Sequence, residues 1–234
     1  MDHRKITDRD LFYERMAHAA DWDAVTNVYE TRRRLELIFG TLLRDVPLQG
    51  ATLLDAGSGG GHFSQAAAAR GAKVTSLDMG VSLLGQVAQR VQSTRCVGSV
   101  LELPFRDGAF DVLLSTEVIE HTPDPPAALA ELARVVRPGG RIVVTTPCRA
   151  WEPVVHMATT LRLRPYNGNE NFTWPASARR ILEASGIRVE RCFGFNLLPL
   201  FVPALDGLHR LLDLAGGPLA PLYVNLAVTG TKRA

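Results

Sequence analysis

The sequence predicts an α/β fold, in which strands that alternate with helices build a parallel sheet. From residue 51 onward, short apolar segments alternate with stretches of helical spacing. A glycine-rich turn follows the first of these segments, and an aspartate ends the second. Strands that alternate with helices require right-handed crossovers, and therefore a parallel sheet. The expected strands span 52–56, 73–78, 95–98, 110–115, 141–146, 187–193 and, near the end of the chain, 223–229.

Prolines and glycines mark where the intervening helices begin and end. The first helix is expected over 62–70, directly after the glycine-rich turn. Pro125 and Pro126 suit the first turn of a later helix, because a proline there has no hydrogen bond to lose. The sequence 138–140, Pro-Gly-Gly, is expected to stop that helix and turn the chain, and Gly186 is expected to end the next one.

The N-terminal residues 1–46 are expected to form a helical cover on the main domain. Apolar residues recur there at spacings of three and four, which places them on one helix face: Leu35, Ile38, Phe39, Leu42 and Leu43. An earlier helix is expected to begin at residues 10–13. No linker separates this part from the rest, so residues 1–234 are expected to form a single domain with a substantial core.

The composition is typical of a soluble globular protein and excludes several classes of function. The chain is 46% hydrophobic with a net charge of +2, and its one basic run, Arg32–Arg33–Arg34, is too short for a nucleic-acid surface. Its three cysteines form no C-x-x-C pair, so neither a disulfide framework nor a zinc-cysteine site is expected. No segment approaches the roughly 20 apolar residues of a transmembrane helix. With a charged start instead of a signal peptide, the expected location is the cytoplasm.

The segment LLDAGSGGG (53–61) and the later segment VTSLDMG, which contains Asp78, predict a nucleoside-binding site. Glycine lets the backbone turn tightly and lets a ligand approach closely, and a helix N-terminus behind the turn offers unpaired N–H groups. An acid at the end of the second strand can accept hydrogen bonds from the two hydroxyls of a ribose. A dinucleotide site would require G-x-G-x-x-G, whereas His62 occupies the sixth position here.

Longer segments resemble one family. The layout D-x-G-x-G-x-G over 55–61 resembles the first motif of class I S-adenosylmethionine-dependent methyltransferases. LELPFRDGAFDVLLSTEVIEHTPDP (101–125), ELARVVRPGGRIVVTTP (131–147) and ILEASGIRVERCFGF (181–195) resemble later segments of that family in the same order. VTSLDMG and EVIEHTPDP are most similar to the quinol O-methyltransferases of ubiquinone biosynthesis. The resemblance implies S-adenosylmethionine as cofactor and a Rossmann-like seven-stranded sheet in the order 3-2-1-4-5-7-6, with the last strand antiparallel.

The resemblance also implies which residues bind the cofactor. Asp55, Gly57, Ser58, Gly59 and Gly61 would face its methionine part, and Asp78 would hold its ribose. Met79 is placed to pack on the adenine, with an ordinary core position as the alternative. Family members often carry an acid near position 99, where this chain has Ser99, so adenine recognition would rest on backbone groups. Val100 and Thr116 complete the expected set.

Glu117, Glu120 and His121 are the candidate catalytic residues. They follow the expected fourth strand, and their spacing places them on one face if the backbone turns helically. A hydroxyl acceptor must lose its proton as it is methylated, and histidine, which titrates near neutrality, is the natural general base. Alternatively, the three side chains hold a divalent ion, Mg²⁺ or Zn²⁺, which lowers the pKa of the acceptor. E-x-x-E-H residues have this metal role in quinol O-methyltransferases, whereas in many other class I methyltransferases an EH pair only shapes the loop.

Two segments are expected to form an enlarged lid over the acceptor. Residues 147–175 contain several aromatic residues in an irregular context, and residues 193–222 are strongly apolar but interrupted by prolines and glycines. Within the second segment, one stripe predicts an amphipathic helix: Leu205, Leu208, Leu211 and Leu212. Apolar surfaces of this kind line a pocket or contact a membrane.

The expected function is therefore methylation of a lipophilic small molecule on a phenolic or quinol oxygen. The alternatives are N- or C-methylation of a natural-product or lipid acceptor, a non-catalytic cofactor-binding scaffold, and a nicotinamide-dependent oxidoreductase, which His62 disfavours. Transient membrane contact is a possible addition, and the sequence does not predict the oligomeric state. Tyr29 and Arg32 are placed to reach the cofactor carboxylate, with a surface position as the alternative for each.

Overall fold

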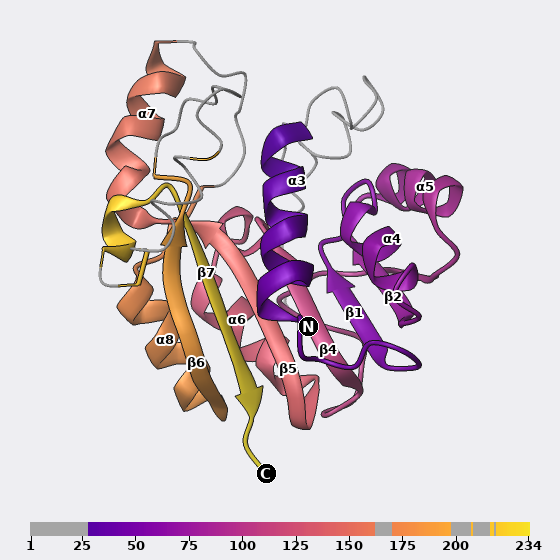
Figure 1. The fold of residues 1–234 in the computed structure, drawn as a ribbon. Coiled ribbons are helices and arrows are strands. Elements are labelled where there is room, and N and C mark those ends of the chain that lie inside the picture. The colour runs from indigo at the N-terminus through magenta and orange to yellow at the C-terminus, as the bar shows by residue number, and fades with distance from the viewer. Residues whose placement is uncertain (1–27, 162–169, 198–206, 208–215, 218) are drawn as a thin grey trace, which may run out of the picture.

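The computed structural model describes residues 28–161, 170–197, 207, 216–217 and 219–234. Its strands are β1 (Thr52–Ala56), β2 (Lys73–Asp78), β3 (Thr94–Val97), β4 (Phe110–Thr116), β5 (Val136–Pro147), β6 (Ile187–Phe195) and β7 (Asn225–Lys232). They form one sheet in the order β3-β2-β1-β4-β5-β7-β6 (Figure 1). β7 runs antiparallel to β5 and β6, and the other neighbours are parallel. The order that the family resemblance implied is confirmed.

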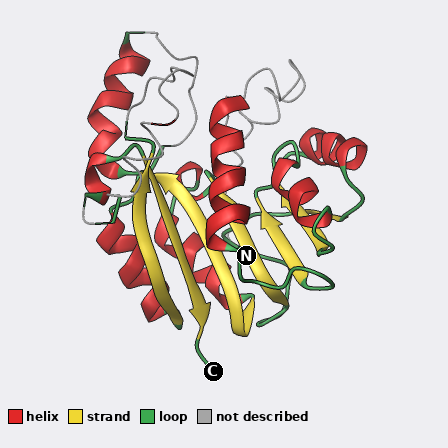
Figure 2. Cartoon of the chain, in the orientation of Figure 1, coloured by secondary structure: helices red, strands yellow, loops and turns green. Residues whose placement is uncertain are grey.

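Helices cover both faces of this sheet (Figure 2). On one face, α3 (Val28–Leu37), the π-helical turn η1 (Ile38–Leu42) and α4 (His62–Ala68) pack an apolar cluster that includes Ile38, Phe39 and Phe63. On the other face, α6 (Pro125–Arg134) and α8 (Pro175–Ala184) contribute Leu129, Leu132 and Leu182 to a second cluster. α5 (Val81–Arg90) follows β2. The central strands β1 and β4 are consequently buried on both faces, which explains why most of their residues are apolar.

The expected helical stripe in the N-terminal cover is confirmed over 35–43. Ile38, Phe39, Leu42 and Leu43 are buried, while Leu35 is half-buried. The earlier helix expected at 10–13 lies outside the described residues. So does the leucine stripe of 205–212 in the second expected lid segment.

Two expectations about local structure were wrong. β5 begins at Val136, so the Pro-Gly-Gly sequence 138–140 lies within this strand segment instead of before it. A register shift between Phe110 and Val112 of β4 accommodates the insertion, and Gly140 passes so close that an added Cβ would lie 2.9 Å from the Asp111 carbonyl oxygen. The stretch 147–175, expected to be irregular, contains the short turn η3 (Arg149–Trp151) and helix α7 (Glu152–Thr160). Pro153 lies in the first turn of α7, where a proline does not break a helix.

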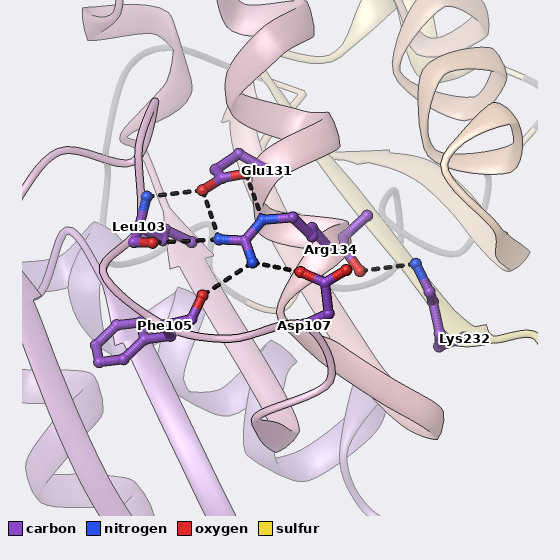
Figure 3. A network of polar contacts seen from close by, with 7 residues as sticks. Leu103, Phe105, Asp107, Glu131, Arg134 and Lys232 are labelled. Atoms are coloured by element: carbon purple, nitrogen blue, oxygen red, sulfur yellow. Dashed lines mark hydrogen bonds and ion pairs between the residues drawn. The ribbon is translucent and has the colours of Figure 1, made fainter.

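A network of polar contacts fixes the loop between β3 and β4 to helix α6 (Figure 3). The Arg134 guanidinium donates to the carbonyl oxygens of Leu103 and Phe105 at 3.2 and 2.8 Å and pairs with Asp107 and Glu131. Glu131 in turn accepts from the Leu103 backbone N–H at 2.7 Å. Two side chains of α6 therefore satisfy the backbone groups of a loop that has no regular structure of its own.

The remaining elements are the short turns η2 (Ile119–His121) and η5 (Ala220–Leu222). Every helix in the described part of the chain is too short or too polar to span a bilayer.

Candidate active site

The glycine-rich turn lies between the carboxyl end of β1 and the N-terminus of α4. Gly57, Gly59 and Gly61 have φ values of 82°, 49° and 83°, in the left-handed region that favours glycine. A Cβ on Gly57 would lie 2.3 Å from Cγ2 of Val118, so this residue also lets the turn pack against the loop after β4. The N–H groups of Gly57 and Ser58 both donate to the Leu77 carbonyl oxygen, at 2.8 and 2.9 Å.

The Asp78 carboxylate is attached to this turn through the backbone. Its Oδ2 accepts from the Gly59 N–H and its Oδ1 from the Gly80 N–H, both at 2.9 Å. The side chain is half-buried at the carboxyl end of β2. A carboxylate has about four lone-pair sites, so it can accept hydrogen bonds from several donors at once. The acid and the glycine turn, which are separate in sequence, are one structural unit.

Exposed apolar side chains lie next to Asp78. Met79 is 57% exposed, so the alternative of an ordinary core position for this residue is wrong. Val97, the partner of Asp78 on β3, is 58% exposed. The next turn holds Ser99, whose hydroxyl accepts from the Leu101 N–H at 3.2 Å, and Val100, whose side chain is buried in the core. Met79 and Val97 thus provide an exposed apolar surface against which a flat ring could pack. Because the Val100 side chain is buried, only the backbone groups of this residue could contact a ligand.

Asp55 is completely buried beneath the glycine turn. Its Oδ2 accepts a 2.6 Å hydrogen bond from the Ser64 hydroxyl, which continues to Ser76 and from there to Ser93. Burial raises the pKa of the Asp55 carboxyl from 3.8 to about 6. Oδ1 of Asp55 and the hydroxyl of Ser58 are buried without a hydrogen-bond partner among the described residues.

Glu117 is held in a strained conformation directly after β4. Its φ is 55°, which is uncommon for a residue other than glycine, asparagine or aspartate. Asn225 Nδ2 donates to Glu117 Oε2 at 2.8 Å, and Arg34 Nη2 of α3 lies 3.5 Å from the same oxygen. Burial raises the pKa of Glu117, and the charge of Arg34 opposes that rise.

Glu120 lies deeper, with 1% exposure. The Thr146 hydroxyl of β5 donates to its Oε2 at 3.0 Å, and His121 Nε2 lies 3.6 Å from its Oε1. Burial, and then the neighbouring charge of Glu117, raise the pKa of Glu120 well above its usual value. Burial therefore disfavours the charged form of both carboxyls.

The structure does bring Glu117, Glu120 and His121 together at the end of β4, but not as one helical face. The left-handed Glu117 breaks the helical path, and only Ile119–His121 form a short 3-10 turn. Glu120 points into the core while His121, whose side chain is 23% exposed, remains accessible. The expectation of a shared helical face is wrong, because strain at Glu117 redirects the chain.

Comparisons with known proteins agree with this geometry. A family model described as "Methyltransferase domain" matches residues 54–144. The ubiquinone biosynthesis O-methyltransferase of Pseudomonas paraeruginosa is 33% identical over 168 residues, which is 65% of this chain and 71% of that protein. The enzyme of the same name from Aeromonas salmonicida is 31% identical over 170 residues, 65% of this chain and 69% of the relative. The malonyl-[acyl-carrier protein] O-methyltransferase of Serratia marcescens is 43% identical, but over only 42% of this chain and 38% of its own.

The chain belongs to the class I S-adenosylmethionine-dependent methyltransferases. Its fold agrees with that of magnesium protoporphyrin IX methyltransferase from Synechocystis, a structure with bound S-adenosylhomocysteine, at a TM-score of 0.66. That protein is 18% identical, and the match covers 97% of this chain and 98% of the other. The cofactor of the present chain, as a member of this family, is S-adenosylmethionine.

The residues around the glycine turn fit that cofactor. The unpartnered buried oxygens of Asp55 and Ser58 accept hydrogen bonds, and the methionine part of the cofactor carries an ammonium donor. Asp78 ends β2, where an acid can accept hydrogen bonds from ribose hydroxyls, and Met79 offers an exposed apolar surface for adenine. Thr116 is 8% exposed at the end of β4, next to the strained Glu117.

The acid cluster of this methyltransferase does not fit a metal ion. No group of three His, Cys, Asp or Glu side chains in the described ranges could hold one. Glu117 Oε2 is occupied by Asn225 and faces Arg34, a cation, while Glu120 Oε2 is occupied by Thr146. The metal role that the family resemblance suggested for Glu117, Glu120 and His121 therefore has no support in their contacts.

Sequence reasoning missed Arg34 and Asn225. Arg32, a candidate for the cofactor carboxylate, has a 74% exposed side chain and pairs with Glu36 along α3. Arg34, at 13% exposure, points inward, pairs with Glu30 at 3.0 Å, and has a buried Nε without a partner among the described residues. The signal was present, because Arg34 precedes Ile38 and Leu42 at spacings of four on the buried face. Nothing in the sequence marked Asn225.

In the expected lid segment 147–175, His156 is exposed on α7 and Trp174 is 44% exposed, whereas Phe172 is buried. Trp151 Nε1 donates to the Leu222 carbonyl oxygen at 3.1 Å, which joins the two expected lid segments. Tyr166 lies outside the described residues.

Proposed function

We propose that this methyltransferase transfers the methyl group to a phenolic or quinol oxygen of a lipophilic small molecule. The observation that carries the proposal is the cluster of Glu117, Glu120 and His121 at the carboxyl end of β4, beside the glycine turn. The relatives named ubiquinone biosynthesis O-methyltransferase, at 31% and 33% identity, support an oxygen acceptor. The apolar composition of residues 193–222 supports a lipophilic one.

In the proposed reaction, His121 is the general base. S-adenosylmethionine supplies a methyl group that is electrophilic because its sulfur is a positively charged sulfonium. When the methyl group is transferred, the rest of the cofactor becomes the neutral thioether S-adenosylhomocysteine. The accessible imidazole of His121 accepts the proton that the acceptor hydroxyl loses as the new O–CH₃ bond forms. Glu120, 3.6 Å from Nε2, orients the ring and stabilises it when it becomes charged.

Glu117 and the rest of the site position the acceptor and exclude water. Holding the two reactants in line is the largest contribution that a methyltransferase must make, worth several kcal/mol. Glu117, fixed by Asn225 and facing Arg34, is a hydrogen-bonding group for the acceptor hydroxyl.

The test is methyl transfer to a redox pair of acceptors. Labelled S-adenosylmethionine is incubated with the enzyme and either a short-chain catechol-type quinol or the matching quinone, and the products are identified by mass spectrometry. The proposal expects a methyl ether from the quinol and none from the quinone, which has no hydroxyl to methylate. An amine, carbon or carboxylate acceptor methylated in preference to the quinol would contradict it. Cofactor binding with no transfer to any acceptor would favour the scaffold alternative.

A further inference from the structure

Two strained backbone positions of the described chain are linked by a single side chain. Within the described residues, Glu117 and Asn196 are the two non-glycine residues with positive φ, at 55° and 58°. Glu117 directly follows β4, and Asn196 directly follows β6. Asn225, the first residue of β7, donates through Nδ2 to Glu117 Oε2 at 2.8 Å and accepts through Oδ1 from Asn196 Nδ2 at 3.2 Å.

The strain at Glu117 requires a compensating contact. Asparagine adopts left-handed φ values fairly readily, whereas glutamate does so rarely. Glu117 also keeps its N–H paired with the Thr145 carbonyl oxygen at 2.9 Å, so the backbone departs from the strand only after this bond. Residues in such conformations persist where their surroundings over-determine them, and they concentrate at functional sites.

Asn225 is suited to this position by its chemistry. The side chain is 5% exposed, and both ends of its amide are used. An aspartate there would place a carboxylate against that of Glu117, and an alanine or leucine would leave a buried carboxylate short of a donor. Asn225 is also fixed in the sheet, since it pairs in register with Pro147 of β5 and Phe195 of β6.

We propose that Asn225 is a positioning residue for methyl transfer, which holds the Glu117 carboxylate toward the acceptor and couples it to the chain at Asn196. This inference rests on the proposed function, in which Glu117 faces the acceptor. Asn196 directly follows β6, within the expected lid segment 193–222. Its backbone is fixed as well, because its carbonyl oxygen accepts from the Val224 N–H at 3.1 Å. Asn225 thereby fixes the Glu117 carboxylate relative to the end of β6.

The experiment compares Asn225→Ala with Thr229→Val on the same strand. The Thr229 hydroxyl is also buried and donates to the Ile142 carbonyl oxygen at 2.9 Å, so its loss removes a β7 hydrogen bond away from the site. A donor to a carboxylate contributes enough that Asn225→Ala should lower kcat/KM for the acceptor by about tenfold or more. The Kd for S-adenosylhomocysteine should stay at the wild-type value. Thr229→Val should lower the Tm but leave kcat/KM near wild type.

A double variant tests whether Asn225 acts through Glu117. If it does, Glu117→Gln with Asn225→Ala should be no slower than Glu117→Gln alone, because the two effects are not independent. Should Asn225→Ala fail to fold, Asn225→Leu also lacks the donor but leaves less empty volume and adds no charge, and the same comparison applies.

Additive losses, or an Asn225→Ala enzyme as active as Thr229→Val, would overturn the inference while leaving the proposed function standing. A fully active Glu117→Gln enzyme would remove Glu117 from the site and overturn the inference, whereas the methylation of the quinol would still support the proposed function.

Discussion

The glycine turn and the Glu117 cluster both lie at the carboxyl ends of the strands, yet different kinds of contact hold them. The turn is fixed by backbone N–H groups, which donate to the Leu77 carbonyl oxygen and, 19 residues away in sequence, to the Asp78 carboxylate. The cluster is fixed by side chains. Arg34, Glu117 and Asn225 come from α3, the end of β4 and the start of β7, and the last two are 108 residues apart.

This difference has consequences for both specificity and evolution. Backbone donors are present whatever the side chain, so the glycine turn with Asp78, here called the cofactor end, depends on a few glycines and one acid. The cluster of Glu117, Glu120 and His121, which the proposed function makes the acceptor end, depends on the identity of residues from three separate elements. A substitution there changes the positions of polar groups while the cofactor turn stays intact, which is how one fold serves many acceptors. We therefore expect the two ends to respond separately to mutation.

The largest expected effect is at the acceptor end. His121→Ala should lower turnover by about 10²- to 10⁴-fold, because the acceptor hydroxyl loses its general base, with little change in cofactor affinity. His156→Ala, on the exposed surface of α7, is the matched control and should retain full activity. Steady-state kinetics with a quinol acceptor measure both. A His121→Ala enzyme as active as the control would exclude the imidazole from catalysis.

At the cofactor end, Asp78→Ala should weaken S-adenosylmethionine binding by at least about tenfold. It removes hydrogen bonds to a charged group, worth about 1.5–3 kcal/mol each, and also releases the Gly59 N–H that the carboxylate holds. Asp45→Ala, at an exposed position, is the control. Titration calorimetry that gave the same Kd for both variants would remove Asp78 from the site.

A third prediction concerns the stability of the protein without cofactor. The pKa of Asp55 rises from 3.8 to about 6 on folding, so its contribution to stability is complete below about pH 4 and is lost as the pH rises through about 6. Asp55→Asn avoids this loss. At pH 8 the variant should therefore be more stable than wild type by about 3 kcal/mol and unfold at a higher temperature, with no gain at pH 4. Thermal melts across pH measure the difference. A constant difference between pH 4 and 8 would mean that Asp55 is ionised in the native protein throughout.

The smallest expected effect is that of removing metal ions. Oε2 of Glu117 is engaged by Asn225 and faces the cation of Arg34, and Oε2 of Glu120 is engaged by Thr146. Dialysis against a strong chelator should therefore leave quinol methylation unchanged. Loss of activity in chelator, with recovery on adding Mg²⁺ or Zn²⁺, would show that the cluster rearranges to bind an ion.

The sequence predicted those parts of the fold that short-range patterns determine. β1 and β2 begin and end at the expected residues, because each contains buried apolar residues and is followed within two residues by a glycine. β5 began earlier than expected because a bulge in its pairing with β4 absorbs a Pro-Gly-Gly sequence that usually marks a turn. Helix α7 lies in a segment that was expected to be irregular, and its proline, Pro153, is in the first turn, where it does not break a helix.

The residues of the site can likewise be separated into those that short-range sequence patterns predicted and those that they did not. The glycine turn and Asp78 were predictable, since their contacts form between neighbouring strands. Choosing Arg34 instead of Arg32 required the helical phase of α3 relative to the sheet. Asn225 was not predictable, because its two partners lie 29 and 108 residues away and no local pattern relates them.

The most direct test of the separation between the two ends is a paired measurement on Glu117→Gln. This variant keeps the size of the side chain and loses the carboxylate that Asn225 and Arg34 engage. If Glu117 serves the acceptor, the Kd for S-adenosylmethionine should remain at the wild-type value while turnover of a saturating quinol falls by about tenfold or more. A Kd that weakens as much as turnover falls would contradict the account, because it would place Glu117 at the cofactor end.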